Sequence, residues 1–174
     1  CVDGGDIAVL TMPWIDYMGP RKPRTVLQSI GLGHLGTCIP YCIGAKLAKP
    51  GARVFSITGD GSFLFNVQEL DTAIKQETPF VVLIADNCCW GMIKNAEKRA
   101  FKKREAFCVD ICSDYVKIAK GFGCHAERVE KPLDLKPAIQ RAVDSGRPAV
   151  LQVPIRFVSP PGAKILASLR ELQF

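Results

Sequence analysis

The sequence has no apolar run long enough to cross a membrane and no segment with the pattern of a secretory signal peptide. It also has no internal repeat and no low-complexity stretch. A chain of 174 residues, of which 48% are hydrophobic, can bury one full core. We therefore expect one cytoplasmic globular domain, with at most a tail. The chain does not begin with Met, and its first residues are typical of the middle of a longer protein.

Although the sequence has eight cysteines, it has no CxxC pair, so the spacing of a standard zinc site is absent. A zinc site made of four thiolates, or of Cys with His, remains an alternative. We favour small buried thiols in a reducing compartment. If their segments are helical, Cys38 and Cys42 share one face, and so do Cys108 and Cys112. The other cysteines are Cys1, Cys88, Cys89 and Cys124.

The formal net charge is +6, and the basic residues gather mainly in residues 94–104, with a smaller group at 21–24. A basic cluster can bind nucleic acid or another anion. Glu97 and Glu105 interrupt this stretch, and it lacks the interleaved aromatic side chains that stack on bases. We therefore expect a solvated helix face or a lid, and no nucleic-acid partner.

Short apolar runs alternate with helical patterns along the chain. The expected strands are 53–58, 80–85 and 149–153. The expected helices are 36–48, 67–75, 115–120 and 135–143. This alternation predicts an α/β fold: a three-layer sandwich with a mostly parallel central sheet and helices on both faces. In such a sheet, ligands bind beyond the carboxyl ends of the strands.

Two of the expected strands end in polar residues. Asp60 follows the first, and Asn87 follows the second. A carboxylate and an amide oxygen at one sheet edge suit Mg²⁺, which usually shares its oxygen ligands with phosphate groups. Gly61 lets the backbone approach a ligand closely, and Ser62 opens a helix whose N–H groups favour a phosphate. Each feature alone is typical of a turn, but their combination, with 25 residues between Gly61 and Asn87, is specific.

The stretch from Gly59-Asp60-Gly61 to Asn87 resembles the thiamine-diphosphate (ThDP) motif of the acetolactate synthase-like superfamily. Segments 31–36, 43–48, 61–63, 66–70 and 90–92 carry the same resemblance, which covers about residues 3–155. The resemblance implies the ThDP-binding fold, with ThDP and Mg²⁺ as cofactors. It also implies a diphosphate-binding domain, which we place in residues 1–158. The loop-like sequence Ser159-Pro160-Pro161-Gly162 then predicts a C-terminal tail in residues 159–174.

The resemblance implies roles for particular residues. Asp60 and Asn87 would bind Mg²⁺ through their side chains, and Cys89 through its backbone carbonyl. Gly33 and Leu35 would meet the aminopyrimidine, and Leu35 would support the bent cofactor. The positions that match cofactor-binding residues of the family are Gly33, Leu35, Gly59, Asp60, Gly61, Ser62, Asn87, Cys89, Gly91 and Met92.

The resemblance also implies that the chain holds only part of an active site. The Glu that activates ThDP belongs to a pyrimidine-binding domain, which we do not find here and expect on the same longer chain or on a partner subunit. A middle domain is also absent from this chain. The acids Glu69, Asp71 and Glu77 are expected to be surface groups. We expect a homo-oligomer, because the site forms between domains of different subunits. His34 is either a substrate-binding group or a helix-entry residue bonded to backbone.

The expected activity is cleavage and formation of C–C bonds in 2-oxo acids, by decarboxylation and carboligation. Asp86, Ala96 and His34 depart from acetolactate synthase itself. The opening Asp3-Gly4-Gly5-Asp6 is similar to relatives that act on acyl-CoA thioesters, the 2-hydroxyacyl-CoA lyase and oxalyl-CoA decarboxylase group. The basic stretch would suit a CoA phosphate, so an acyl-CoA substrate is the second hypothesis. A third is a non-catalytic assembly or regulatory domain that retains the fold.

Overall fold

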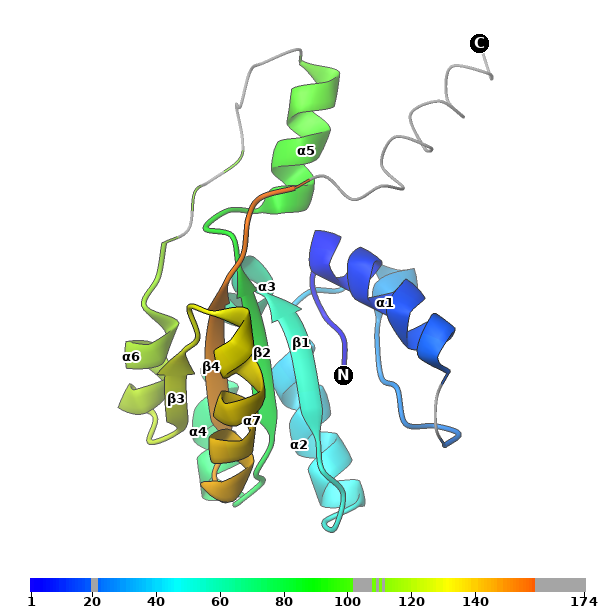
Figure 1. Cartoon of the computed structure of the whole chain (residues 1–174). Helices are drawn as coiled ribbons and strands as arrows, with labels where there is room; N and C mark the ends of the chain where they lie inside the picture. The colour runs from blue at the N-terminus through cyan, green and yellow to red at the C-terminus, as the bar shows by residue number, and fades with distance from the viewer. Residues whose placement is uncertain (20–21, 102–107, 109, 111, 159–174) are drawn as a thin grey trace.

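The computed structural model describes residues 1–158, except 20, 21, 102–107, 109 and 111 (Figure 1). In this part of the chain one sheet contains β1 (Phe55–Gly59), β2 (Val81–Asp86), β3 (His125–Arg128) and β4 (Ala149–Pro154). The strand order is β1-β2-β4-β3, and each neighbouring pair is parallel. The carboxyl ends of the strands therefore meet at one edge of the sheet, the upper edge in Figure 1.

Helices surround the sheet. They are α1 (Asp6–Met18), α2 (Cys38–Ala48), α3 (Asp60–Phe65), α4 (Glu69–Lys75), α5 (Gly91–Ala100), α6 (Tyr115–Gly121) and α7 (Leu135–Asp144). Two short 3₁₀ helices, Ile30–Leu32 and Pro132–Asp134, complete the set for the described residues. None of the described helices is long and apolar enough to span a bilayer.

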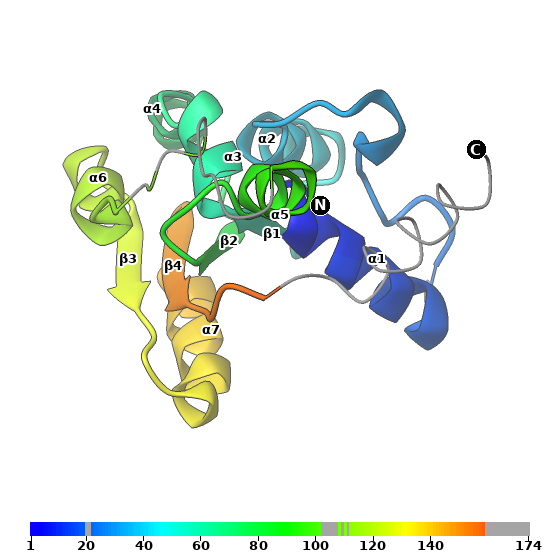
Figure 2. The same cartoon turned by 90° about the horizontal axis from the view of Figure 1, so that it is seen from above.

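The two faces of the sheet carry two separate cores. On one face, α2, α4 and α6 pack on alternate residues of β2, among them Val82 and Ile84 (Figure 2). On the other face, α7 packs on Val81 and on Leu151 of β4. α1 lies beside β1, where Val2 forms a parallel bridge with Ile57. The predicted three-layer α/β sandwich is confirmed.

Each predicted strand and helix has a counterpart in the structure, with bounds that differ by up to two residues. α1 and β3 were not predicted. α1 contains Pro13, which interrupts the pattern of a helix, and β3 has only four residues with a mixed polar sequence. The two strongly predicted strands, β1 and β2, are the ones that position the site.

Two sequence-based expectations concern the chain around α5. The shared face of Cys108 and Cys112 depended on a helical segment, but the described residues around them form no helix, and Asp110 makes an antiparallel bridge with Cys89. The expected solvated helix face holds for Lys98 and Arg99 of α5, which are exposed, whereas Glu97 is buried and accepts a hydrogen bond from the N–H of Cys108. Residues 102–107, including Glu105, lie outside the described residues, as do Arg21 and the expected tail 159–174.

Candidate active site at the carboxyl edge of the sheet

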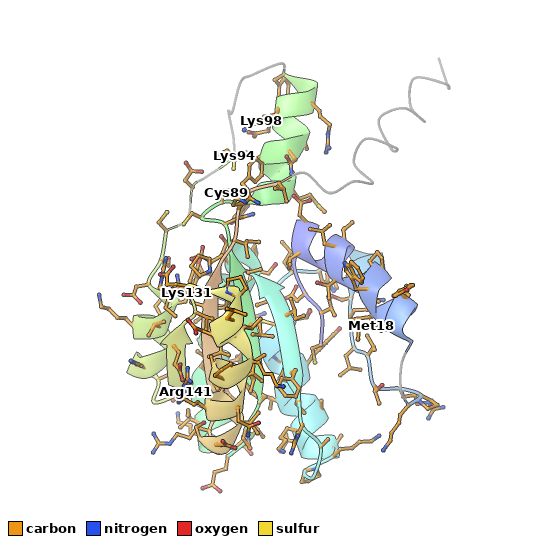
Figure 3. All side chains as sticks on the ribbon, viewed as in Figure 1. Met18, Cys89, Lys94, Lys98, Lys131 and Arg141 are labelled. Atoms are coloured by element: carbon orange, nitrogen blue, oxygen red, sulfur yellow. The ribbon has the colours of Figure 1, made fainter. Side chains whose placement is uncertain are left out.

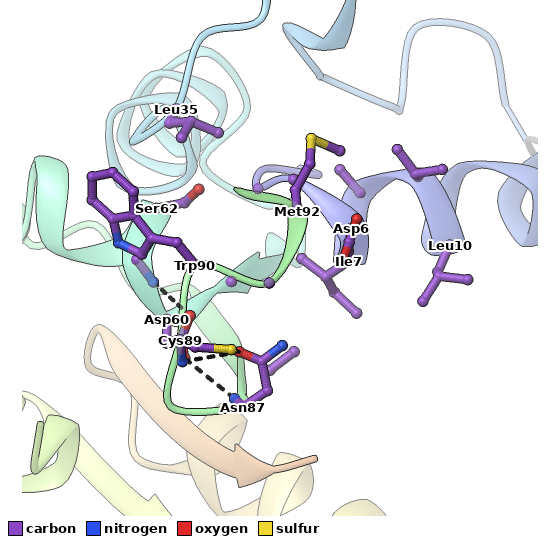
Figure 4. Close-up of a pocket in the computed structure, with 18 of the residues that line it drawn as sticks. Asp6, Ile7, Leu10, Leu35, Asp60, Ser62, Asn87, Cys89, Trp90 and Met92 are labelled. Atoms are coloured by element: carbon purple, nitrogen blue, oxygen red, sulfur yellow. Dashed lines mark hydrogen bonds between the residues drawn. The ribbon is translucent and has the colours of Figure 1, made fainter. Parts of the chain in front are cut away.

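The parallel register of β1 and β2 places the residues that follow the two strands side by side. Gly59 pairs with Ala85, so Asp60 and the loop that begins at Asn87 leave the sheet next to each other. One carboxylate oxygen of Asp60, Oδ2, accepts hydrogen bonds from the N–H groups of Asn87 and Cys89, each at 3.2 Å (Figure 4). The other oxygen, Oδ1, accepts the N–H of Gly61 at 2.7 Å. Two residues 27 positions apart are thus joined as the sequence predicted.

The amide oxygen of Asn87 points to the same place as the Asp60 carboxylate. Its Oδ1 accepts the N–H of Cys89 at 3.2 Å, so this one N–H serves both oxygens (Figure 4). A carboxylate oxygen and a neutral amide oxygen therefore converge at the end of β2. This donor set suits a hard divalent cation such as Mg²⁺.

The tight turn after β2 depends on Cys88, which has a positive φ of 56°. Its N–H donates to Oδ1 of Asp86 at 3.1 Å. The other oxygen of Asp86 accepts a 2.7 Å hydrogen bond from Nε2 of Gln152 on β4. Asp86 and Gln152 are both buried, so this hydrogen-bonded pair holds the turn at Cys88 in place from the side of the sheet. A residue that was singled out only as a departure from the family thus holds the loop in shape.

Burial raises the pKa of Asp60 to about 6, and the neighbouring carboxylate of Asp86 adds to the effect. Hydrogen bonds from the N–H groups of Gly61 and Cys89 oppose it. The ionised form of Asp60 is therefore costly without a nearby positive charge. A bound cation would supply that charge, so the electrostatics of this edge also fit a metal ion.

A cavity of about 360 Å³ opens above Asp60. Its size lies within the range of about 300–1,000 Å³ that is common for ligand pockets. Apolar side chains, among them Ile7, Leu35 and Met92, form much of its wall, and Asp60 and Asn87 contribute polar groups (Figure 4). The lining includes all the positions predicted to bind the cofactor: Gly33, Leu35, Gly59, Asp60, Gly61, Ser62, Asn87, Cys89, Gly91 and Met92.

Residues 6–153 match the family described as thiamine pyrophosphate enzyme, C-terminal TPP binding domain. The chain belongs to this family. Thiamine pyrophosphate is ThDP, so the predicted fold family and the predicted ThDP cofactor are confirmed, while Mg²⁺ stays a prediction.

The chain is also similar to acetolactate synthases. It is 36% identical to the probable acetolactate synthase large subunit of Methanococcus aeolicus, over 92% of this chain and 28% of that protein. It is 33% identical to the acetolactate synthase of Bacillus subtilis, over 81% and 25%. It is 30% identical to the acetolactate synthase isozyme 2 large subunit of Escherichia coli, over 99% and 33%. The chain thus spans a third or less of the length of each relative.

The TPP-binding domain also uses residues that the sequence analysis did not assign to the cavity. Gly4 to Leu10, at the start of the chain and in α1, form one of its walls. Asp3 anchors this wall, because its carboxylate accepts the N–H groups of Gly4 at 2.7 Å and of Cys38 at 3.1 Å. The motif Asp3-Gly4-Gly5-Asp6 was noticed only through its resemblance to acyl-CoA relatives. The hydrophobic pattern of Gly4 to Leu10 does not predict that this segment lines the cavity.

The start of α5 packs closely on the predicted metal ligands. A Cβ atom at Gly91 would lie 2.9 Å from Nδ2 of Asn87, so only glycine fits here without moving the Asn87 amide. A Cβ at Gly5 would lie 3.0 Å from the Cβ of Met92. Asn95 of α5 donates to Oδ2 of Asp6 at 2.8 Å and so ties α5 to α1. Burial raises the pKa of Asp6, and the hydrogen bond from Asn95 opposes this shift.

Two further positions refine the predicted site. The N–H of Gly61 donates to Asp60, so its contact with a diphosphate stays a prediction. His34 lines the cavity and is exposed, while its backbone carbonyl accepts a 3.3 Å hydrogen bond from the Ser29 hydroxyl. Both interpretations of His34 remain open.

Among the described residues, no group of three or more His, Cys, Asp or Glu side chains could hold a metal, which argues against the alternative of a thiolate zinc site.

Proposed function

We propose that this domain holds the diphosphate end of ThDP through one Mg²⁺ ion. The protein ligands are the Asp60 carboxylate, the Asn87 amide oxygen and the Cys89 carbonyl. The observation that carries the proposal is the shared N–H of Cys89, which brings the Asp60 and Asn87 oxygens together at the end of β2. Diphosphate oxygens and water would complete the octahedron that Mg²⁺ prefers.

The rest of the cofactor would extend from Asp60 toward Leu35 and Met92. Both side chains line the cavity and are 39% exposed in this chain. Gly33 and Leu35 would meet the aminopyrimidine, and Ser62, Gly91 and Met92 would contact the diphosphate or the part of the cofactor next to it. Because the apolar wall is still open, we infer that a pyrimidine-binding domain covers it, on the same longer chain or on a second subunit of a homo-oligomer.

Bound ThDP supplies a carbanion-stabilising ring for reactions that break or form a C–C bond beside a carbonyl. Residues of this chain bind the metal, orient the diphosphate through Asp60 and Asn87, and exclude water with Leu35 and Met92. We place the activating Glu on the pyrimidine-binding domain. The described acids Glu69, Asp71 and Glu77 are absent from the cavity lining.

We propose that the whole protein is a cytoplasmic enzyme that decarboxylates 2-oxo acids and joins the remaining acyl group to an acceptor. The support is the similarity over most of this chain to proteins named acetolactate synthases. The paired Asp60 and Asn87 oxygens argue against a decayed, non-catalytic domain, because such a domain has no physical need to bring both together at a sheet edge.

The test is an assay of the native protein that carries this domain, supplied with ThDP, Mg²⁺ and a short 2-oxo acid such as pyruvate. We expect release of CO₂ and a new C–C bonded product, detected by mass spectrometry, and no turnover without ThDP. Cleavage of a 2-hydroxyacyl-CoA thioester, with no reaction of the 2-oxo acid, would establish the acyl-CoA hypothesis instead. Retention of ThDP with no turnover of either substrate would favour a non-catalytic role.

A further inference from the structure

The wall of the cavity contains a basic side chain that the proposed function does not use. The acids among the lining residues are Asp6 and Asp60, and the bases are His34 and Arg156. A guanidinium group keeps its charge at every physiological pH, whereas an imidazole does not. Among the described residues that line the cavity, Arg156 is therefore the permanent cation.

The parallel pairing of β2 and β4 places Arg156 next to the proposed metal site. Asp86 at the end of β2 pairs with Pro154 at the end of β4, and the N–H of Ile155 donates to the carbonyl of Asp86 at 2.8 Å. Asn87 follows Asp86 directly, so Arg156 and Asn87 leave the sheet at neighbouring positions of the same edge. This is the edge at which we propose that the diphosphate binds.

The residue after Arg156 packs on α5 and fixes the course of the chain. The ring centroid of Phe157 lies 5.0 Å from Nζ of Lys98 and 5.9 Å from Nζ of Lys94, two residues of α5 that rise above this edge (Figure 3). A Cβ atom at Gly91 would lie 3.6 Å from Cδ2 of Phe157. Phe157 is thus held against α5, while Arg156 beside it borders the cavity.

The positive charge of Arg156 is available to a ligand. None of the ion pairs found among the described residues involves Arg156, and the residue is exposed. Lys94, by contrast, lies outside the lining and is paired with Asp110 at 3.0 Å. The guanidinium group is planar and presents several N–H donors at once, a geometry that matches the oxygens of a phosphate group.

The charges at this edge favour a second cation beside the metal. Both phosphate groups of ThDP are anionic, and an ionised Asp60 adds a further negative charge, whereas the metal is a single divalent ion. A bound cofactor would therefore leave an excess of negative charge in a partly buried site. A guanidinium group at the same edge would offset that excess.

We propose that Arg156 is a further cofactor-binding residue, whose guanidinium group binds the diphosphate of ThDP directly. The inference rests on the proposed function, because it takes the diphosphate to lie at Asp60 and Asn87. A substrate carboxylate is the other anion that could bind Arg156. The position of Arg156 beside Asn87 favours the diphosphate.

The experiment titrates ThDP by calorimetry into the native protein that carries this domain, at saturating Mg²⁺. We expect Arg156→Gln to lower the ThDP affinity by about tenfold, because a charge-assisted contact is lost. Arg156→Lys keeps the charge without the planar fork, so its loss should be smaller. The matched control Arg147→Gln removes an exposed arginine that precedes the amino end of β4, at the opposite edge of the sheet, and should bind like the wild type.

Wild-type ThDP affinity in Arg156→Gln overturns the proposal, even if this variant has a higher KM for the 2-oxo acid or binds coenzyme A more weakly. Equal losses in Arg156→Gln and Arg147→Gln also overturn it, because they would reflect net charge alone. In both cases the wild type still binds ThDP with Mg²⁺, and the proposed function stands. A wild type that binds no ThDP contradicts the proposed function and this inference together.

Discussion

Asp60 organises the site at the scale of a single residue. Its two carboxylate oxygens accept N–H groups from Gly61, Asn87 and Cys89, which belong to the ends of two different strands. These bonds set the shape of the loop, while burial raises the pKa of Asp60 to about 6. The same side chain therefore positions the other proposed ligands, and its ionised form is favoured by a nearby cation.

Gly91 gives a test of how closely this site is packed. In Gly91→Ala the new Cβ lies 2.9 Å from Nδ2 of Asn87, so the amide must turn or shift, and the oxygen that we propose binds the metal moves with it. We expect ThDP affinity in the presence of Mg²⁺ to fall by about tenfold, as measured by titration calorimetry, because ligand orientation controls metal affinity.

The matched control for this substitution is Gly44→Ala in α2. A Cβ at Gly44 has no neighbour within 4 Å beyond its own helix backbone. This variant should bind ThDP as the wild type does and gain up to about 1 kcal/mol in free energy of unfolding, because Ala favours a helix over Gly. Equal ThDP affinity of Gly91→Ala and Gly44→Ala would contradict the close packing that we describe.

At the scale of elements, strand β4 supports a loop that belongs to β2. Gln152 of β4 holds Asp86, Asp86 holds the N–H of Cys88, and Cys88 adopts the positive φ that turns the chain back toward Asp60. α5 begins directly after this loop and is tied to α1 by Asn95 and Asp6. The site is therefore built by the packing of elements from both ends of the chain.

The contribution of the buried Gln152–Asp86 hydrogen bond to the free energy of unfolding can be compared with that of an exposed bond of the same type, from Gln140 to Asp144. In Gln152→Leu, the buried carboxylate of Asp86 loses its amide donor, so we expect the free energy of unfolding to fall by about 1–3 kcal/mol. In Gln140→Leu, the lost bond is the 2.7 Å contact with Asp144 on the surface of α7, and the change should stay below about 0.5 kcal/mol. Urea denaturation measures both, and equal losses would show that burial is not what makes the Gln152 pair matter.

At the scale of the whole molecule, sequence periodicity was sufficient to predict the layers of the fold and the edge of the sheet at which the site lies. Buried strands such as 80–85 are continuous apolar runs, and parallel strands must end at the same edge. α1 and β3 could not be predicted, because Pro13 and the polar residues of β3 contradict the local pattern and only packing against β1 and β4 fixes them.

The same contrast holds for the site. Asp60 and Asn87 could be predicted, since each follows a recognisable strand. The wall formed by Gly4 to Leu10 and the support from Gln152 could not, because both depend on contacts between distant parts of the chain.

The most direct test of this account is ThDP binding to the native protein, measured by calorimetry with Mg²⁺ and with the divalent ions chelated, above the pKa of Asp60. We predict that the wild type binds ThDP only with Mg²⁺ and that Asp60→Asn lowers this affinity by more than about 100-fold while keeping the fold, as judged by thermal unfolding. Asp71→Asn, which removes an exposed carboxylate paired with Lys75, should bind like the wild type. Wild-type affinity in Asp60→Asn, or equal binding without a divalent cation, would contradict the proposal that Asp60 holds the metal.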